Sequence, residues 1–199
     1  EFGKDPLDLF KLQRLDPAYR IFFHDGEKVD VSADLQRNYQ LFDSLEKDGA
    51  QKLKVYLDES REKYDTAILD LLYRDYSRLT DFLDLKLMKQ GRKMKMFENL
   101  DAFVNKHFES DKAKKIVEYS IGFLGGSPSN TPSFYHIMSH IDFTLGVWYP
   151  EGGMRAVVQA MYEMALSMGV KFQFNEPVTR LVTEGKMVRK VVTSKGEYT

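Results

Sequence analysis

The stretch GVWYPEGGMRAVVQAMYEMALSMGVKFQFN, residues 146–175, decides the expected fold of the C-terminal part of the chain. It has the pattern of a strand, a turn at Pro150–Gly153, a helix that ends at Gly169, and a second strand. A helix that follows a Gly-Gly pair is a common frame for a nucleotide cofactor, because its first turn presents free N–H groups to an anion. The dinucleotide fingerprint G-x-G-x-x-G is nowhere in the 199 residues, so the frame occurs without this motif.

The residues after this helix predict further strands. Val170, Phe172 and Phe174 alternate with polar residues, which predicts the strand that completes a βαβ unit. The stretches PVTRLV and MVRKVV follow, with turns at Glu184–Gly185 and Lys195–Gly196, and together they predict a β-meander.

The first part of the chain is expected to be mainly helical, with one β-hairpin. Residues 1–14 have the apolar spacing of the end of a helix. Residues 19–31 alternate around an Asp-Gly turn, which predicts the hairpin. Apolar steps of three and four residues predict amphipathic helices from Gln51 onward, at 99–108 and at 111–124.

A further helix is expected after the loop that is rich in Gly, Pro and Ser. Thr131 is the expected N-cap and Pro132 the first helical residue, and the helix is expected to continue to about Ile141. The expected fold class is therefore α+β. A helical domain at 1–145, whose hairpin contributes to a sheet, is followed by a βαβ unit and meander at 146–199.

Composition excludes several classes of function. Lys plus Arg is 29 and Asp plus Glu is 30, so the chain lacks the excess of cations that nucleic-acid binding requires. It has no cysteine, which excludes disulfides, thiolate catalysis and zinc sites built on Cys. No apolar run approaches the length of a membrane span, and no signal peptide is recognisable. The chain begins at Glu1 and ends in an expected strand, so we expect it to be a piece of a longer protein.

One segment combines cations with large apolar residues. We call it the basic segment; its cations are Lys86, Lys89, Arg92, Lys93 and Lys95. Leu87, Met88 and Met94 lie between them, Met96 and Phe97 follow directly, and no acidic residue lies between them. Two interpretations stay open: a solvated helix and loop, or a membrane-surface patch whose cations meet lipid headgroups while the apolar side chains enter the acyl boundary.

Few residues suggest chemistry of their own. His136 and His140 are four residues apart on an expected helix and could face one metal ion, but no third ligand is evident. Packing or a polar role on the substrate side is the preferred interpretation, and we expect no metal. No serine lies in G-x-S-x-G and no lysine lies in a phosphate-loop motif. The chain therefore shows no hydrolytic or phosphoryl-transfer machinery.

Five stretches, in this order, resemble the phytoene desaturase branch of the FAD-dependent amine-oxidase-like flavoproteins. They are LDPAYRIFFHDGEKVDV, YLDESREKYDTAI, GGSPSNTPSFYHIMSHID, GVWYPEGGMRAVVQAM and GVKFQFNEPVTRLV. The strongest is G-V-W-Y-P-x-G-G-M. Together they cover nearly the whole chain, and their order and spacing make the combination specific.

The resemblance implies a function for the parent protein. In this family the FAD fingerprint lies N-terminal to these stretches, so the chain is expected to be an internal fragment that does not hold FAD by itself. The family removes hydrogen from a polyene, with a flavin as the acceptor. Residues 1–145 would then be the substrate-binding domain, and 146–199 an incomplete return to the FAD-binding domain. The substrate would be a carotenoid or similar isoprenoid, and the enzyme would be cytoplasmic and peripherally associated with a membrane.

The resemblance also assigns roles to individual residues, while the catalytic residues stay unknown. A structural role in the hairpin is the preferred alternative for Asp16, Tyr19 and Arg20. A rival activity within the family is saturation or isomerisation of a polyene, and a rival of another class is a non-enzymatic helical lipid-binding or scaffold module. The implied FAD contacts are Gly152, Gly153, Met154 and Val178, and the implied substrate contacts are Asp16, Tyr19, Arg20, Tyr149 and Pro150.

Overall fold

The computed structural model describes residues 3, 5–68 and 98–199, and the basic segment lies outside them. The chain divides into two compact units. One is Leu12–Tyr149, which we call the helical unit; the other combines Glu1–Lys11 with Pro150–Thr199, and we call it the C-terminal unit. Their identification as a substrate-binding and an FAD-binding part stays a prediction.

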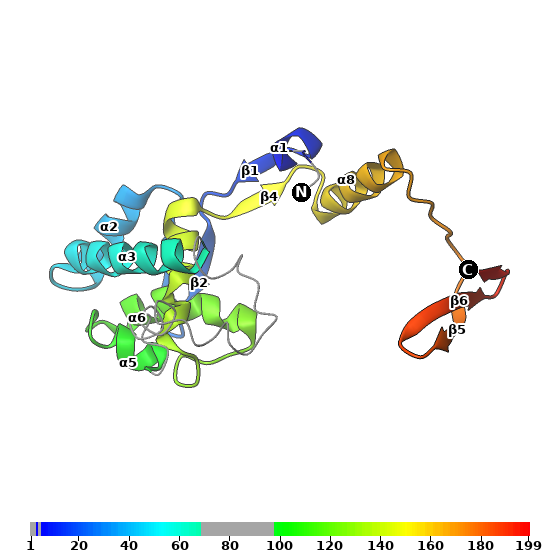
Figure 1. Cartoon of the computed structure of the whole chain (residues 1–199). Coiled ribbons are helices and arrows are strands. Elements are labelled where there is room, and N and C mark those ends of the chain that lie inside the picture. The colour runs from blue at the N-terminus through cyan, green and yellow to red at the C-terminus, as the bar shows by residue number, and fades with distance from the viewer. Residues whose placement is uncertain (1–2, 4, 69–97) are drawn as a thin grey trace. The chain divides into compact units, whose positions relative to one another are not determined.

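Helices α2 (Leu35–Leu45), α3 (Gly49–Thr66), α5 (Leu100–Val104) and α6 (Asp111–Glu118) form the body of the helical unit (Figure 1). The predicted helices are confirmed over the ranges of α3, α5 and α6, and α2 is an additional helix that the sequence analysis did not predict. The buried aliphatic and aromatic residues form one core. Its largest members include Phe42, Leu53, Tyr56, Leu100, Phe103, Phe108, Ile116 and Phe143.

Local chemistry sets where these helices begin. The side chains of Asp34, Asn99 and Ser110 accept hydrogen bonds from backbone N–H groups in the first turns of α2, α5 and α6, which satisfies donors that a helix start leaves free. The start of α3 is set by close packing instead. A Cβ atom at Gly49 would lie 1.9 Å from the carbonyl oxygen of Phe42, so only glycine lets α3 begin against the end of α2.

The predicted β-hairpin is confirmed. Strands β2 (Tyr19–Phe22) and β3 (Lys28–Val31) pair antiparallel, with Tyr19 opposite Val31 and Phe22 opposite Lys28. The inward-facing Val29 and Val31 are buried in the core. Among the described strands the hairpin forms a two-stranded sheet of its own and joins no larger one.

The expectation of a helix over 1–14 is largely wrong. Helix α1 covers only Pro6–Leu9, and strand β1 (Leu12–Arg14) follows it. This strand pairs with β4 (Trp148–Pro150), which lies more than a hundred residues later in the chain. A strand partner this remote gives no signal in the spacing of the N-terminal residues, and its hydrogen bonds outweigh the local helical pattern.

The segment after α6 changes helix type several times. It contains the 3₁₀ helices η3 (Tyr119–Leu124) and η4 (Ser133–His136), the short α7 (Ile137–His140) and the π-helical η5 (Ile141–Leu145). The predicted start is wrong by one residue, because Pro132 is itself the N-cap. The carbonyl of Thr131 accepts a hydrogen bond from Leu100 N at 2.8 Å, so Thr131 joins this segment to α5.

The C-terminal unit contains α8 (Met154–Ser167) and a three-stranded antiparallel sheet. Its strands β5 (Val178–Glu184), β6 (Met187–Thr193) and β7 (Glu197–Tyr198) confirm the predicted meander. Residues 170–174 form no strand, so the βαβ expectation is wrong for the described chain. A parallel strand exists only beside a partner, and the described residues place none there. The mixed α+β class holds.

Candidate functional site

The turn before α8 has a backbone conformation that requires glycine. Gly152 has a φ of 85°, and Gly153 has a φ of 80° with a ψ of −179°. The second combination is accessible essentially only to glycine. Gly153 is also the N-cap of α8 and has no side chain with which to cap it. Ala156 N donates to Gly153 O at 2.9 Å, so the N–H groups of Met154 and Arg155 are those that can donate to an external acceptor. The turn thus has the donors that an anionic or carbonyl-bearing ligand needs.

The other implied cofactor contacts lie at accessible positions of the same unit. Met154 opens α8 and is 64% exposed, and Val178 opens β5 and is 57% exposed. The side chains of Met154 and Val178 are therefore both exposed, but no described contact joins Val178 to the turn before α8.

Two of the implied substrate contacts are engaged in holding the hairpin. The Asp16 carboxylate accepts hydrogen bonds from Ser32 Oγ at 2.9 Å and from Ala33 N at 3.0 Å, and these bonds, above all that from Ala33, lower the pKa of Asp16. The Arg20 guanidinium makes a two-pronged pair with Asp30 on the opposite strand, at 2.5 and 2.8 Å. Their partners give both side chains a structural role.

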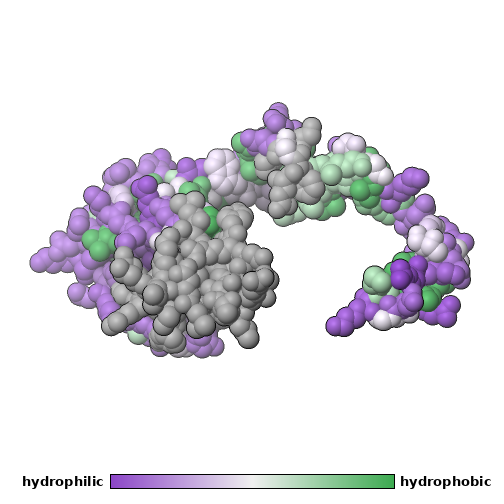
Figure 2. Space-filling model, viewed as in Figure 1, coloured by the Kyte–Doolittle hydropathy of each residue, from purple (hydrophilic) through white to green (hydrophobic). Residues whose placement is uncertain are grey.

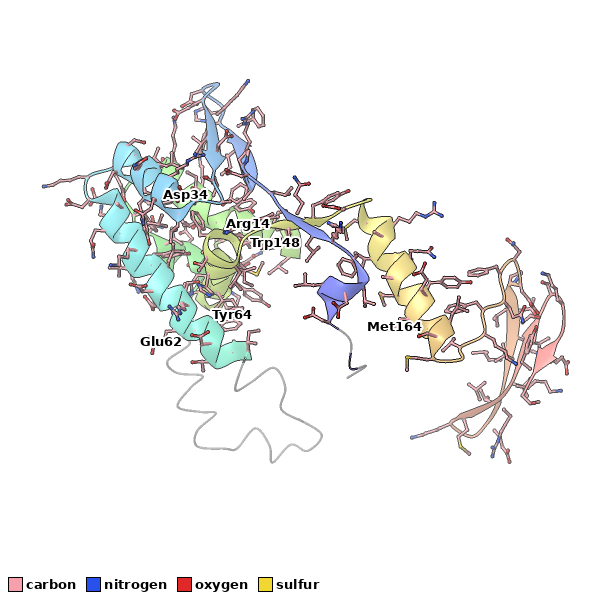
Figure 3. All side chains as sticks on the ribbon, turned by 90° about the horizontal axis from the view of Figure 1, so that it is seen from above. Arg14, Asp34, Glu62, Tyr64, Trp148 and Met164 are labelled. Carbon is pink, nitrogen blue, oxygen red and sulfur yellow. The ribbon has the colours of Figure 1, made fainter. Side chains whose placement is uncertain are left out.

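Tyr149 and Pro150 lie at the end of the β1–β4 pair. Tyr149 is half exposed and Pro150 is buried. Next to Tyr149, Trp148 donates from Nε1 to Leu145 O at 2.9 Å, and the Arg14 guanidinium lies 6.0 Å from the indole centroid. Figure 3 shows Arg14 and Trp148 side by side. A cation over an indole ring strengthens the pairing of these two strands.

Tyr19 lies in a different environment from Asp16 and Arg20. Its ring is 3.8 Å from that of Tyr119 between centroids. Its hydroxyl is buried and has no hydrogen-bond partner of normal geometry among the described residues. Burial, followed by the nearby Tyr119 and Asp142, raises the pKa of Tyr19. Burial likewise raises the pKa of Asp142 to about 6.

Sequence reasoning missed Tyr119 and Asp142. Tyr119 falls within the helix expected at 111–124, and Asp142 directly follows the helix expected to end at about Ile141. One signal was available, because Asp142 is the only Asp, Glu, Lys or Arg between Glu118 and Glu151. A single carboxyl group in such an apolar stretch marks a position where the fold must provide for a polar group.

The two histidines considered as metal ligands have separate surroundings. His136 is buried against Phe103 and Tyr56, and its Nδ1 lies 2.8 Å from Ser133 O. His140 packs on Tyr64, with 5.1 Å between the ring centroids. Within the described part of the chain, no group of three or more His, Asp or Glu side chains could hold a metal ion.

Ser60 links these histidines to α3. Its hydroxyl donates to His136 O at 2.7 Å and accepts from His140 N at 3.0 Å. Both bonds are buried, and both connect residues more than seventy positions apart in the chain. Ser60 thereby holds η4 and α7 on α3.

An apolar groove of about 810 Å³ runs along α8. Phe172 and Phe174 stack at 6.0 Å on one side, and Tyr162 lies 4.6 Å from Phe172 between centroids. Figure 2 shows hydrophobic residues gathered on the surface of α8. Exposed apolar surfaces of this kind mark binding sites. Lining side chains include Val158, Met161, Tyr162, Ala165, Phe172 and Phe174.

No helix of the described residues is both long enough and apolar enough to cross a membrane.

Comparison with known proteins adds to this geometry. The chain is 39% identical over 193 residues to the carotenoid 3,4-desaturase of Haloarcula japonica, and this alignment covers 96% of this chain and 39% of that protein. It is 27% identical over 195 residues to the zeta-carotene-forming phytoene desaturase of Myxococcus xanthus, and this alignment covers 98% of this chain and 38% of that protein. It is 25% identical over 187 residues to a 4,4'-diapophytoene desaturase of Staphylococcus aureus strain Newman, and this alignment covers 94% of this chain and 37% of that protein.

The chain thus spans about two fifths of the length of these relatives. Residues 4–199 match the family described as flavin containing amine oxidoreductase. The match extends over both compact units. The chain belongs to the flavin-containing amine oxidoreductase family, and it resembles the carotenoid desaturases within it.

Proposed function

We propose that the protein containing this chain is an FAD-dependent oxidoreductase that dehydrogenates a carotenoid or a similar isoprenoid polyene. The observation that carries this proposal is the family match over residues 4–199 together with the similarity to proteins named as carotenoid desaturases. A non-enzymatic lipid-binding or scaffold module is not favoured, because the match to a flavin-containing family includes nearly every residue of the chain.

The residues of the C-terminal unit fit a contact with FAD. The uncapped start of α8 offers backbone donors, and the positive-φ turn at Gly152–Gly153 lets a planar group approach the backbone without meeting a Cβ atom. We propose Gly152, Gly153 and Met154 as contacts at this turn and Val178 as a separate contact. FAD, when bound, accepts the hydride equivalent that leaves the polyene.

The helical unit is proposed to bind the polyene. Tyr149 and Pro150 lie where the chain leaves this unit, and Tyr19 has its hydroxyl inside it. Asp16 and Arg20 act indirectly in this proposal, because their hydrogen bonds to Ser32, Ala33 and Asp30 hold the hairpin that carries Tyr19. Dehydrogenation of a hydrocarbon requires positioning and exclusion of water rather than an acid–base pair, so we assign no catalytic base.

Peripheral membrane association is part of the same proposal. Carotenoid precursors are apolar enough to reside in a bilayer, so an enzyme that takes them up works at a membrane surface. The basic segment supports this proposal through its cations and interleaved apolar residues.

The test is to purify the intact protein that contains this chain and incubate it with phytoene or another acyclic polyene in liposomes. We expect a flavin absorption spectrum, bleaching of that spectrum when substrate is added without an acceptor, and products with additional conjugated double bonds. A protein that binds the polyene but carries no flavin would contradict the proposal. Products with fewer or rearranged double bonds would favour the rival activities of saturation or isomerisation.

A further inference from the structure

The C-terminal unit leaves apolar residues exposed that a helix layer normally buries. Among the buried hydrophobic residues of the described chain, Ala160 alone belongs to this unit. Helices in proteins are stabilised mainly by the packing of an apolar face, so α8 lacks the layer that such packing requires. The exposed large hydrophobic residues of α8 and of the segment after it include Met154, Val158, Met161, Met168, Phe172 and Phe174.

This exposed surface includes the groove of about 810 Å³ along α8. The rings of Phe172 and Phe174 are stacked, with 9° between their planes, and their centroids lie 4.6 and 5.9 Å from that of Tyr162. Side chains two positions apart point to the same face when a chain runs as a strand. Residues 170–174, which we call the unpaired segment, thus present alternate side chains to α8 as a strand over a helix does, although they form no strand.

The backbone of the unpaired segment is almost unused. Val170 N donates to Ala165 O at 3.0 Å. From Lys171 to Phe174, however, no backbone N–H or C=O group makes a hydrogen bond to any described residue, and all of these residues are exposed. Backbone groups require partners when they are covered, and an open row of them is a template for another strand. A partner that covers the groove can therefore also pair with this backbone.

Several features indicate that the partner is polypeptide of the same protein. Lipid tails carry no donors or acceptors for the open backbone groups, and the polar Lys171 and Gln173 alternate with the two phenylalanines. The chain aligns with about two fifths of the length of its relatives, so most of each relative lies outside the alignment. Polypeptide in the same molecule has a high effective concentration at the segment, which favours it over a second copy.

We propose that in the intact protein a β-strand from outside residues 1–199 pairs with the unpaired segment and covers the groove along α8. The pairing completes the backbone hydrogen bonds of the segment, and the apolar side chains of the added strand fill the groove beside Tyr162, Phe172 and Phe174. The α8 surface is then an internal interface of the parent protein. This docking does not depend on the reaction that the protein catalyses.

The first experiment measures amide hydrogen exchange of the intact protein by mass spectrometry. Peptides that cover the unpaired segment should exchange at least about a hundredfold more slowly than an unstructured peptide, because strand pairing protects amides. Exchange at the unprotected rate would overturn the proposal. Protection that disappears on dilution would also overturn it, because it would identify the partner as a second copy.

The second experiment identifies the partner by photo-cross-linking. A benzoylphenylalanine is placed at Phe174, which is 64% exposed, or at Phe22 on the hairpin, which is 67% exposed and serves as the matched control. The label at Phe174 should cross-link within one polypeptide to a residue outside 1–199, and the label at Phe22 should not reach that residue. A cross-link from Phe174 to a second copy or to lipid, or no cross-link, would overturn the proposal.

Variants connect the groove to the pairing. Phe174→Ala should speed exchange of the unpaired segment in the intact protein at least about tenfold, since it removes an aromatic ring from the proposed interface. Phe22→Ala should leave this exchange within about twofold. Phe174→Leu keeps an apolar side chain and should stay within about threefold of wild type. Equal effects of Phe174→Ala and Phe22→Ala would contradict the docking.

The docking and the proposed function fail in different ways. Flavin absorbance and polyene conversion are measured on the same preparations. Flavin-dependent conversion by a protein whose segment exchanges freely would leave the proposed function standing and reject the docking. A protected segment with the expected cross-link, in a protein that carries no flavin, would support the docking and reject the dehydrogenase.

Discussion

Acidification should reduce the contribution of His136 to the stability of the helical unit, and His136→Gln should remove this pH dependence. His136 is 1% exposed, with Nδ1 bonded to Ser133 O and with Nε2 lacking a partner in the described structure. Burial is the main cause that lowers the pKa of His136 to about 4, and the nearby Lys63 adds to it. Glu59 and His107 also lie close enough to influence the ring.

The sign follows from proton binding in the two states. In the unfolded chain the imidazole takes up its proton near the ordinary pKa of 6.5, and in the folded unit only near 4. The unfolded state therefore binds more protons between these values, and the free energy of unfolding falls as the pH drops through this window. The His136 contribution is about 2 kcal/mol at pH 5 and about 3 kcal/mol below both values.

Glu118 works in the opposite direction. Burial, followed by the nearby Asp101, raises the pKa of Glu118 to about 7 from an ordinary 4.5. The folded state then binds more protons between these values, so this group adds stability as the pH falls from 7. Glu118 is half-buried, and solvent reduces its contribution. Asp142, whose pKa burial raises to about 6, acts in the same direction as Glu118. The pH profile of the wild-type protein therefore sums opposing contributions, and the difference between wild type and His136→Gln isolates the contribution of His136.

The assay is urea denaturation of the purified chain followed by far-UV circular dichroism at pH 7, 6 and 5. At pH 7 His136→Gln should be less stable than wild type, because the imidazole packs on Phe103 and Tyr56. Between pH 7 and 5, however, the free energy of unfolding should change by about 2 kcal/mol more in the favourable direction for the variant than for wild type. His24→Gln, in the exposed hairpin turn, is the control and should follow wild type. Parallel pH profiles for His136→Gln and wild type would refute the reasoning.

Three further predictions concern the turn, the flavin and the membrane. Gly153→Ala should cost about 1–3 kcal/mol, because the backbone conformation at this position is open essentially only to glycine; thermal unfolding of the variant, compared with Gly196→Ala at an unstrained and uncrowded site, measures it. The purified chain by itself should show no yellow flavin absorbance, and a stoichiometric amount of bound FAD would show that these residues suffice to hold the cofactor. Sedimentation with anionic liposomes should weaken when four cations of the basic segment are replaced by Gln, and unchanged sedimentation would reject the membrane patch. The four are Lys89, Arg92, Lys93 and Lys95.

Several elements of this protein follow from local sequence. The Asp-Gly turn and the alternation around it predict the β2–β3 hairpin, and the Gly-Gly pair and the final Gly169 predict both ends of α8. The β5–β6–β7 meander follows from alternation and turn residues. These elements depend on backbone conformations and periodicities that neighbouring residues decide. Two of the residues that we propose as flavin contacts, Gly152 and Gly153, belong to this class.

Other features were decided by tertiary structure, because they depend on partners remote in sequence. β1 replaces an expected helix since β4 pairs with it, and residues 170–174 form no strand since the described chain provides no partner. The Ser60 bonds to His136 and His140 span more than seventy residues. The ring contact of Tyr19 on the hairpin with Tyr119 in η3 likewise joins residues a hundred positions apart. Residue type indicates that such a group can bond or carry charge, but only the folded chain decides which groups meet.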